Sequence, residues 1–197
     1  THADGFPVEP HEAESVVLGM GERYDAVITA GDGAFAVVAE ALGKQDQALA
    51  VLRTASGSAP SKDAKLPQTK SPATAADLRA ASAVGLPQRA VDRTLVLELT
   101  GVMEKYDWAI NGKRMDMDRP MRDALGIVEG ERVALEFKNS TTMWHPMHLH
   151  GHTFALPSGL RKDTVLMAPM QSFAIDLDAD ETDDAAGAAR DAEPLHV

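Results

Sequence analysis

Four of the chain's seven histidines lie within the eight residues of the stretch HPMHLHGH, from His145 to His152. An even spread of histidine along the chain would put only about 0.3 in such a window, so the cluster needs a chemical explanation. A buried imidazole requires a hydrogen bond or a metal ion for each ring nitrogen that leaves water. The neighbouring residues are mostly apolar: Met143, Trp144, Met147, Leu149 and Phe154. A shared metal site is therefore the interpretation that this cluster favours.

Strand geometry divides these histidines into two groups. Successive side chains of a β-strand point to opposite faces, so His148, His150 and His152 share a face, whereas His145 has the other parity. Pro146 bends the chain between the groups, and three residues of strand span roughly 10 Å. We therefore expect two metal sites, with His145 serving one and His148 and His150 serving the other.

The metal is not fixed by the histidines alone, because imidazole binds zinc, copper, iron and nickel. A zinc hydrolase that opens with H-x-H-x-D-H is one alternative. That pattern requires an aspartate where this chain has His152 and a histidine where it has Thr153, so the alternative fails. The chain has no cysteine, which excludes disulfides, thiolate ligands and a cysteine nucleophile.

Composition limits the class of partner. The net charge of −11 and the pI of about 5.0 argue against nucleic acid and against an anionic membrane surface. A hydrophobic content of 44% is sufficient for a buried core, and no run of eighteen apolar residues predicts a membrane-inserted helix. The chain opens at Thr1 rather than Met, so we expect a piece of a longer protein and infer nothing from the lack of a signal peptide.

Residues 93–178 have the alternating pattern of short β-strands. Leu95, Leu97 and Leu99 fall on one predicted face, and the stretches 130–140 and 148–156 are further strand candidates. The pair Asn111-Gly112 is the strongest short-range signal for a β-hairpin. Many short antiparallel strands predict a β-sandwich or a Greek-key barrel.

The rest of the chain differs in character. Residues 1–57 are predicted to be the end of another β domain, although the alanines in 33–43 leave that stretch open between strand and helix. Residues 58–92 are rich in Pro, Ser, Lys and Ala, which predicts a linker with one short helix near 74–83. Residues 179–197 are acidic and alanine-rich, and we expect them to be disordered.

The histidine stretch resembles a known motif. HPMHLHGHTF, preceded by VALEFKNSTTMW, is similar to the third-domain copper motif of the multicopper oxidases, the laccase-like family. VVLGMGERYDAVI resembles the late second-domain strand pair of that family, and YDWAINGKRMD resembles its third-domain opening hairpin. The likeness covers most of residues 15–55 and 93–178.

This resemblance implies an all-β fold of cupredoxin-like Greek-key β-sandwich type. Residues 1–57 would be the C-terminal part of a second domain, 58–92 a linker, and 93–178 a truncated third domain, followed by the disordered tail 179–197. It also implies that His145 ligates the type 1 copper, His148 the type 2 copper and His150 one of the type 3 pair. His152 matches a position that is usually not a ligand. His2 and His11 lie in polar sequence and are expected at the surface.

The resemblance further implies an activity. In the intact family, a small electron donor such as a phenol, an amine or a metal ion loses single electrons at the type 1 copper. A trinuclear copper cluster then reduces dioxygen to water. Such oxidases usually work in the periplasm or outside the cell, so the family implies a periplasmic or secreted protein.

This chain departs from the family pattern in one important way. The second copper motif of the family, built around H-C-H, is absent, as is the first domain. One hypothesis is a frameshift just past Asp180, which the other two reading frames of the coding DNA would reveal. The chain supplies one ligand to each of three copper sites, and missing domains or another chain would have to complete them. We expect the chain alone to be inactive, with a non-catalytic or vestigial metal-binding β domain as the alternative.

Overall fold

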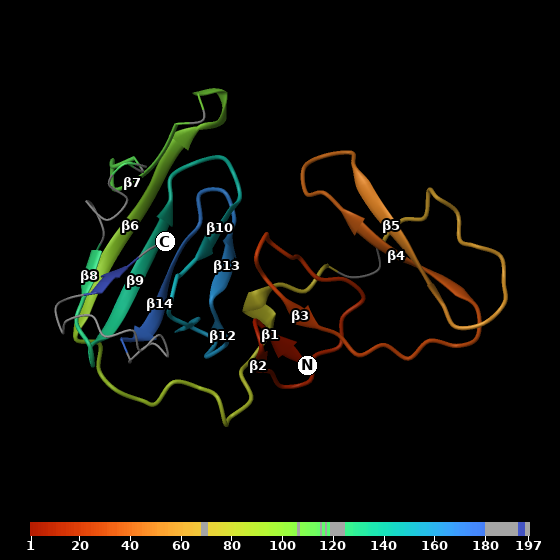
Figure 1. Ribbon diagram of the computed structural model, residues 1–197, viewed down its shortest axis with the longest axis horizontal. Coiled ribbons are helices and arrows are strands. Elements are labelled where there is room, and N and C mark those ends of the chain that lie inside the picture. The colour runs from red at the N-terminus through yellow and green to blue at the C-terminus, as the bar shows by residue number, and fades with distance from the viewer. Residues whose placement is uncertain are drawn as a thin grey trace. The chain divides into compact units, whose positions relative to one another are not determined.

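The structure is a computed structural model that describes residues 1–67, 71–105, 107–114, 116, 118, 125–179 and 193–195. Within these residues the regular structure is β-strand, apart from two single-turn 3₁₀ helices, Ala75–Asp77 and Met103–Lys105 (Figure 1). This confirms the predicted all-β class. The chain divides into a larger unit, made of Thr1–His11, Leu18–Asp25 and Thr74–Val197, and a smaller unit, made of Glu12–Val17 and Ala26–Ala73.

A six-stranded sheet forms the main layer of the larger unit. Its strands, in spatial order, are β12 (Arg161–Lys162), β11 (Phe154–Ala155), β14 (Ser172–Asp178), β9 (Arg132–Asn139), β6 (Arg93–Val102) and β7 (Asp107–Ile110). The neighbours β6 and β9 run parallel, with Leu95 opposite Leu135, whereas the other pairs in this sheet are antiparallel. The alternation expected from the sequence holds, because Leu97 and Leu99 are buried while Val96 is exposed.

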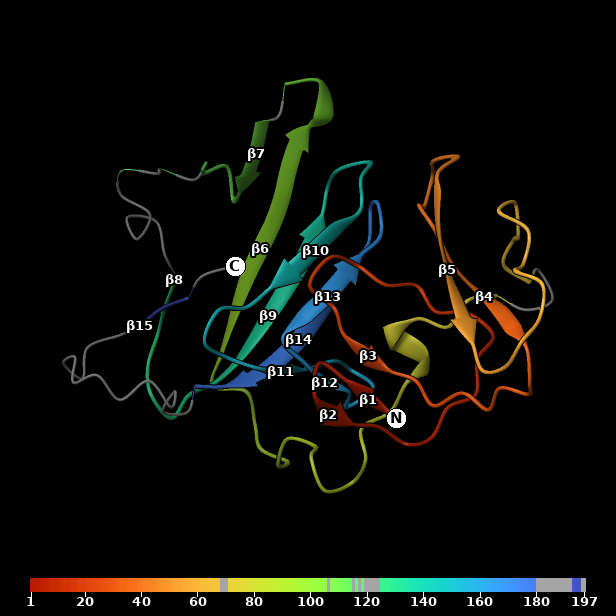
Figure 2. The same cartoon turned by 45° about the vertical axis from the view of Figure 1, so that its right-hand side comes forward.

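A second pair of strands packs on one face of this sheet. β10 (His145–His148) and β13 (Thr164–Met167) are antiparallel to each other and lie beside β9 and β14 (Figures 1 and 2). The buried side chains of the two layers form one hydrophobic cluster, which includes Leu97, Leu135, Phe137, Met147, Val165, Met167, Ile175 and Leu177. Burial of this apolar area is the main force that holds the two layers together.

Smaller sheets complete the larger unit. The N-terminal segment forms a three-stranded sheet from β1 (His2–Ala3), β2 (Phe6–Pro7) and β3 (Tyr24–Asp25). β8 (Leu125–Ile127) pairs with β15 (Glu193–Leu195), so these three residues of the tail predicted to be disordered form a strand. Residues 180–192, 196 and 197 of that tail lie outside the described residues.

Turn chemistry explains the predicted hairpin at Asn111-Gly112. Both residues have positive φ angles, 51° and 75°, which is the requirement of a two-residue type I′ turn. Ile110 and Lys113 exchange backbone hydrogen bonds of 3.0 and 2.9 Å across it. The Asn111 side chain also bonds the backbone of Val96 and Glu98, so the turn is tied to β6 as well. The predicted turn is confirmed, and in the described residues the Ile110–Lys113 bridge closes it.

The smaller unit contains one hairpin, in which β4 (Ala34–Glu40) pairs with β5 (Gln47–Arg53). Residues 33–43, for which the sequence left strand and helix open, therefore form a strand over Ala34–Glu40.

The helix predicted near 74–83 is shorter than expected, because only Ala75–Asp77 are helical and Leu78 is already extended and buried. No helix in the described part of the chain is both long and apolar enough to cross a membrane.

An ion pair ties the ends of two central strands together. The buried Arg132 guanidinium bonds both carboxylate oxygens of Asp178, directly across from it in the β9–β14 register, with 2.7 Å between Nη2 and Oδ2. The hydrogen bonds from Arg132 lower the pKa of Asp178 below its ordinary value of 3.8. The folded state therefore favours the ionised carboxylate.

We expect Asp178→Asn to lower the free energy of unfolding at neutral pH by about 1–3 kcal/mol, because it removes a charged hydrogen-bonded pair. The folded pKa is the depressed one, so this stabilisation is complete above the ordinary pKa and is lost as pH falls through the folded value. Denaturant unfolding across pH should show the two proteins converging in acid. Glu136→Gln, at an exposed position of β9, is the control; a pH-independent difference for Asp178→Asn would contradict the ion-pair account.

Candidate metal centre

The pairing of β10 with β13 positions the first two histidines. His145 lies opposite Met167 and His148 lies opposite Thr164 in the register. Because the two histidines are three residues apart on one strand, their side chains leave it on opposite faces. The ring of His148 lies 4.9 Å from that of His150, whereas the ring of His145 stands edge-on to Trp108 at 5.5 Å. The structure thus brings His148 and His150 together and places His145 in different surroundings.

The prediction of one continuous strand through 148–156 is wrong. β10 ends at His148, and the next strand, β11, begins only at Phe154. Gly151 has a φ of 72°, in the left-handed region that extended strands do not use. Strand parity therefore does not place His150 and His152 on a common face with His148. His150 meets His148 through this turn instead.

A buried asparagine organises the loop before His145. The Asn139 amide nitrogen donates to the backbone oxygens of Met143 and Ala168, both at 2.8 Å. Its carbonyl oxygen accepts from the backbone N–H of Thr141 at 3.0 Å and from the Thr141 hydroxyl at 2.8 Å. Since the first two partners can only accept, the orientation of the amide is fixed, and so is the direction of the Thr141 hydroxyl proton.

This chain of bonds determines the neutral tautomer of His145. The Thr141 hydroxyl gives its single proton to Asn139, so its oxygen can only accept at the 2.8 Å contact with His145 Nε2. His145 must therefore carry its proton on Nε2, which leaves Nδ1 as the nitrogen with a free lone pair. Burial also lowers the pKa of His145 below its ordinary value of 6.5, so the ring stays neutral to lower pH. A neutral imidazole with a fixed lone pair is the form that binds metal.

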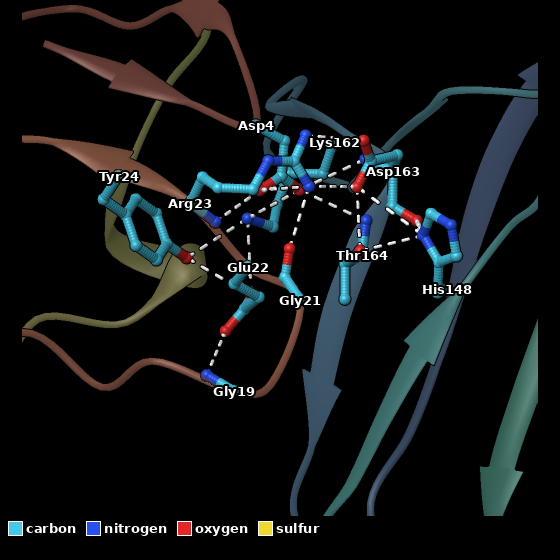
Figure 3. Close-up of polar contacts among 10 residues, drawn as sticks. All are labelled: Asp4, Gly19, Gly21, Glu22, Arg23, Tyr24, His148, Lys162, Asp163 and Thr164. Carbon is cyan, nitrogen blue, oxygen red and sulfur yellow. Dashed lines mark hydrogen bonds and ion pairs between the residues drawn. The ribbon is translucent and has the colours of Figure 1, made fainter.

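His148 has the opposite arrangement. Its Nδ1 lies 3.0 Å from the backbone oxygen of Asp163 and 3.0 Å from the Thr164 hydroxyl oxygen (Figure 3). The Asp163 oxygen can only accept, and the Thr164 hydroxyl donates its proton to the Asp163 carboxylate at 2.8 Å. Nδ1 of His148 must therefore carry the proton, and Nε2 holds the lone pair.

These residues match part of a metal site. Imidazole nitrogens suit copper, and hydrogen bonds to the second ring nitrogen are the usual support of a histidine ligand. In the part of the chain that the structure describes, no group of three or more His, Cys, Asp or Glu side chains is placed to hold a metal ion. The described residues thus supply individual histidine ligands, and a complete metal site would need further ligands beside them.

Sequence reasoning missed the residues that orient the histidines. Asn139 and Thr141 gave one signal, since both are polar residues between an amphipathic strand and the histidine stretch. Asp163 and Thr164 gave none, because their contact with His148 depends on the pairing of β10 with β13.

Comparison with known sequences identifies relatives for both halves of the chain. Two family models, each described as multicopper oxidase, match residues 1–57 and 88–184. Multicopper oxidase MmcO of Mycobacterium tuberculosis (strain ATCC 25618 / H37Rv) is 40% identical over 186 residues, which are 91% of this chain and 36% of that protein. A copper resistance protein A homolog of Pseudomonas syringae pv. tomato is 37% identical over 98 residues, 46% of this chain and 16% of the relative. The chain thus spans little more than a third of the first relative and less of the second.

Solved structures show the same fold. The laccase from Botrytis aclada has a TM-score of 0.66 at 17% identity, over 89% of this chain and 41% of the laccase. Fet3p, described as a multicopper oxidase that functions in iron import, has a TM-score of 0.60 at 16% identity, over 89% of this chain and 45% of Fet3p. The sandwich is therefore of the cupredoxin-like Greek-key class, as the sequence predicts. Taken with the two family models and the relative at 40% identity, this shows that the chain belongs to the multicopper oxidase family.

Asn139→Ala should lower the free energy of unfolding by about 2–4 kcal/mol, because it leaves several buried backbone groups without partners. The control is Ser140→Ala at the residue next to Asn139. It removes one hydrogen bond, from the Ser140 hydroxyl to the Glu98 carboxylate at 2.6 Å, and should lower the free energy of unfolding by less than about 1 kcal/mol. Denaturant unfolding measures both. Equal losses in the two variants would show that Asn139 does not organise this loop.

The environment of His145 gives a separate prediction. In the apoprotein the ring should titrate below 6.5 in NMR spectra, since burial disfavours the charged form. Trp108→Ala opens one side of the ring to water and should move the His145 pKa upward, toward the ordinary value. Trp144→Ala truncates the other tryptophan of the chain and is the matched control. The explanation fails if both variants shift the His145 pKa equally.

Proposed function

We propose that His145, His148 and His150 are the copper ligands that this chain contributes to a multicopper oxidase. His145 would belong to the type 1 site, His148 to the type 2 site and His150 to the type 3 pair. The observation that carries the proposal is the division of the histidines, since His148 and His150 lie ring to ring while His145 stands on the other face of β10. Membership in the family supports copper as the metal, and imidazole is a suitable ligand for it.

The residues of this chain would prepare the ligands rather than perform chemistry themselves. Bound copper supplies reversible one-electron transfer. Thr141 holds the His145 ring through Nε2, and the Trp108 ring packs against it at 5.5 Å, nearly perpendicular to it. Asp163 and Thr164 hold His148 through Nδ1. Each ring is thereby held in one orientation before any metal binds, which reduces the entropy lost on binding.

The whole protein would be an oxidase of laccase-like type. A small electron donor, such as a phenol, an amine or a metal ion, would be oxidised near His145, and dioxygen would be reduced to water near His148 and His150. Other parts of the protein or another chain would supply the missing ligands. We place residues 1–57 in a second and 93–178 in a third cupredoxin-like domain, joined by the linker 58–92, because the family models match 1–57 and 88–184. Family resemblance favours a periplasmic or secreted protein.

A second candidate is a non-catalytic or vestigial metal-binding β domain. Two observations favour it for this chain taken alone. The 197 residues contain no cysteine, and a blue copper site requires a thiolate ligand. The described residues also hold no complete set of metal-binding side chains. On this account the chain binds copper weakly and does not turn over.

Copper titration of the purified chain tests the ligands. Loss of a residue that only orients a ligand costs about 10–100-fold in affinity, so loss of a ligand itself should cost at least about tenfold. We expect His148→Ala and His150→Ala each to raise the copper Kd by that amount. The double variant should be little worse than either single one, because both residues would ligate the same trinuclear cluster. His145→Ala should act independently of both.

The control is His11→Ala, at an exposed position, which should leave the copper Kd unchanged. Additive effects of His148→Ala and His150→Ala would contradict a shared trinuclear cluster. A blue absorbance band with oxygen consumption by this chain alone would contradict the ligand count. Bound copper without either would favour the non-catalytic candidate.

A further inference from the structure

A buried cluster of charged side chains lies on the other side of Asp163 and Thr164 from His148 (Figure 3). The side chains of Asp4 and Lys162 are 0% exposed and that of Glu22 is 2% exposed. Asp4 and Glu22 come from the N-terminal segment, whereas Lys162 comes from β12, about 140 to 160 residues later. Buried charges are costly unless they are paired and hydrogen-bonded, so the cluster must be well satisfied or have a role.

Lys162 is paired with the N-terminal segment. Its Nζ donates a hydrogen bond of 3.3 Å to the Tyr24 hydroxyl and forms ion pairs with Asp4 Oδ2 at 3.1 Å and Glu22 Oε1 at 3.3 Å. The ammonium group also lies 4.4 Å from the centre of the Tyr24 ring. Burial raises the pKa of Tyr24 above its ordinary value, and Glu22 adds to this, so the phenol stays protonated. These contacts hold the N-terminal segment against β12.

Asp4 fixes the backbone next to His148. It occupies the tip of the β1–β2 hairpin with a φ of 46°, followed by Gly5 at 87°, which is a two-residue turn that aspartate tolerates. Its Oδ2 accepts from the backbone N–H groups of Asp163, at 3.2 Å, and Thr164, at 3.1 Å. Its Oδ1 accepts from the backbone N–H of Arg23 at 2.8 Å. One carboxylate thus joins the segment to the start of β13.

Arg23 holds the side chain of Asp163. Its guanidinium bonds both carboxylate oxygens of Asp163, at 2.8 and 2.7 Å, in the bidentate geometry that is strongest for this pair. Asp163 is therefore held at its backbone by Asp4 and at its carboxylate by Arg23. The carbonyl oxygen and the carboxylate of Asp163 are the two groups that set the tautomer of His148, the first directly and the second through the Thr164 hydroxyl.

We propose that Asp4 and Arg23 are positioning residues for His148. Through Asp163 and Thr164 they hold the proton on Nδ1 and keep Nε2 available as the metal-binding atom. Without Arg23, the Asp163 carboxylate is released and the Thr164 hydroxyl can turn its proton toward His148 Nδ1, which admits the opposite tautomer with Nε2 protonated and unable to bind metal. The relevance to metal rests on the proposed function, whereas the control of the tautomer does not.

The test uses the full chain without metal, at a pH about two units above the ordinary imidazole pKa of about 6.5, where the rings are neutral. Long-range ¹H–¹⁵N NMR spectra distinguish the two neutral tautomers of each histidine. In the unsubstituted chain His148 should carry its proton on Nδ1. In Arg23→Gln and in Asp4→Asn the population with the proton on Nε2 should rise about fivefold or more, as expected for the loss of a hydrogen bond to a charged group.

Asp25→Asn is the matched control for Asp4→Asn, because it also removes one negative charge from the N-terminal segment, at a side chain that is 72% exposed. It should leave His148 unchanged. The Arg23 side chain is 53% exposed, so Arg23→Gln decides the matter if Asp4→Asn fails to fold. The His145 tautomer, held by Thr141, reports in the same spectra that each variant keeps its fold.

Two results would overturn the proposal: an Nε2-protonated His148 in the unsubstituted chain, or an unchanged His148 tautomer in folded Arg23→Gln. The readout does not involve copper. If the tautomer shifts as expected but the chain binds no copper, the proposed function fails while the positioning role of Asp4 and Arg23 stands.

Discussion

The antiparallel pairing of β10 with β13 is the interaction on which the arrangement of the histidines depends. Met147 points from β10 into the hydrophobic core with Val165 and Met167 of its partner strand, and burial of these side chains sets the register. A shift by one residue would turn His145 and His148 to the other faces and expose the apolar side chains between them. The same burial that stabilises the sandwich therefore also determines which way each imidazole points.

Polar groups buried beside this strand pair determine the tautomer of each histidine. Asn139 and Thr141 hold the proton of His145 on Nε2, and Asp163 and Thr164 hold the proton of His148 on Nδ1. Two histidines of one strand thus present different nitrogens. Because each buried partner is itself hydrogen-bonded, a wrong tautomer would leave a donor or an acceptor unsatisfied, and that cost discriminates between the two forms.

Local patterns in the sequence were sufficient for the fold class and for many of the strands. The alternation of Leu95, Leu97 and Leu99 predicts β6, and Asn111-Gly112 predicts the turn that follows β7, because both depend on residues close in sequence. The break after His148 was missed, since the left-handed Gly151 outweighs an otherwise strand-like pattern. The contacts of Asp4 and Arg23 with Asp163 could not be predicted, because side-chain bonds across some 140 to 160 residues have no period to detect. The role of His145, His148 and His150 as copper ligands stays a prediction.

The parallel pairing of β6 with β9 has a consequence for how the protein reaches this structure. Arg93 lies opposite Val133, so the ladder cannot form until about forty residues of chain have closed into a loop. Antiparallel neighbours such as β6 and β7 need only a short reversal and can zip from it. The centre of the sheet therefore depends on contacts between residues far apart in sequence, and its assembly is expected to be slower than that of the hairpins. Until then the unpaired edge of β6 is open to other chains, so slow closure gives aggregation more time to compete.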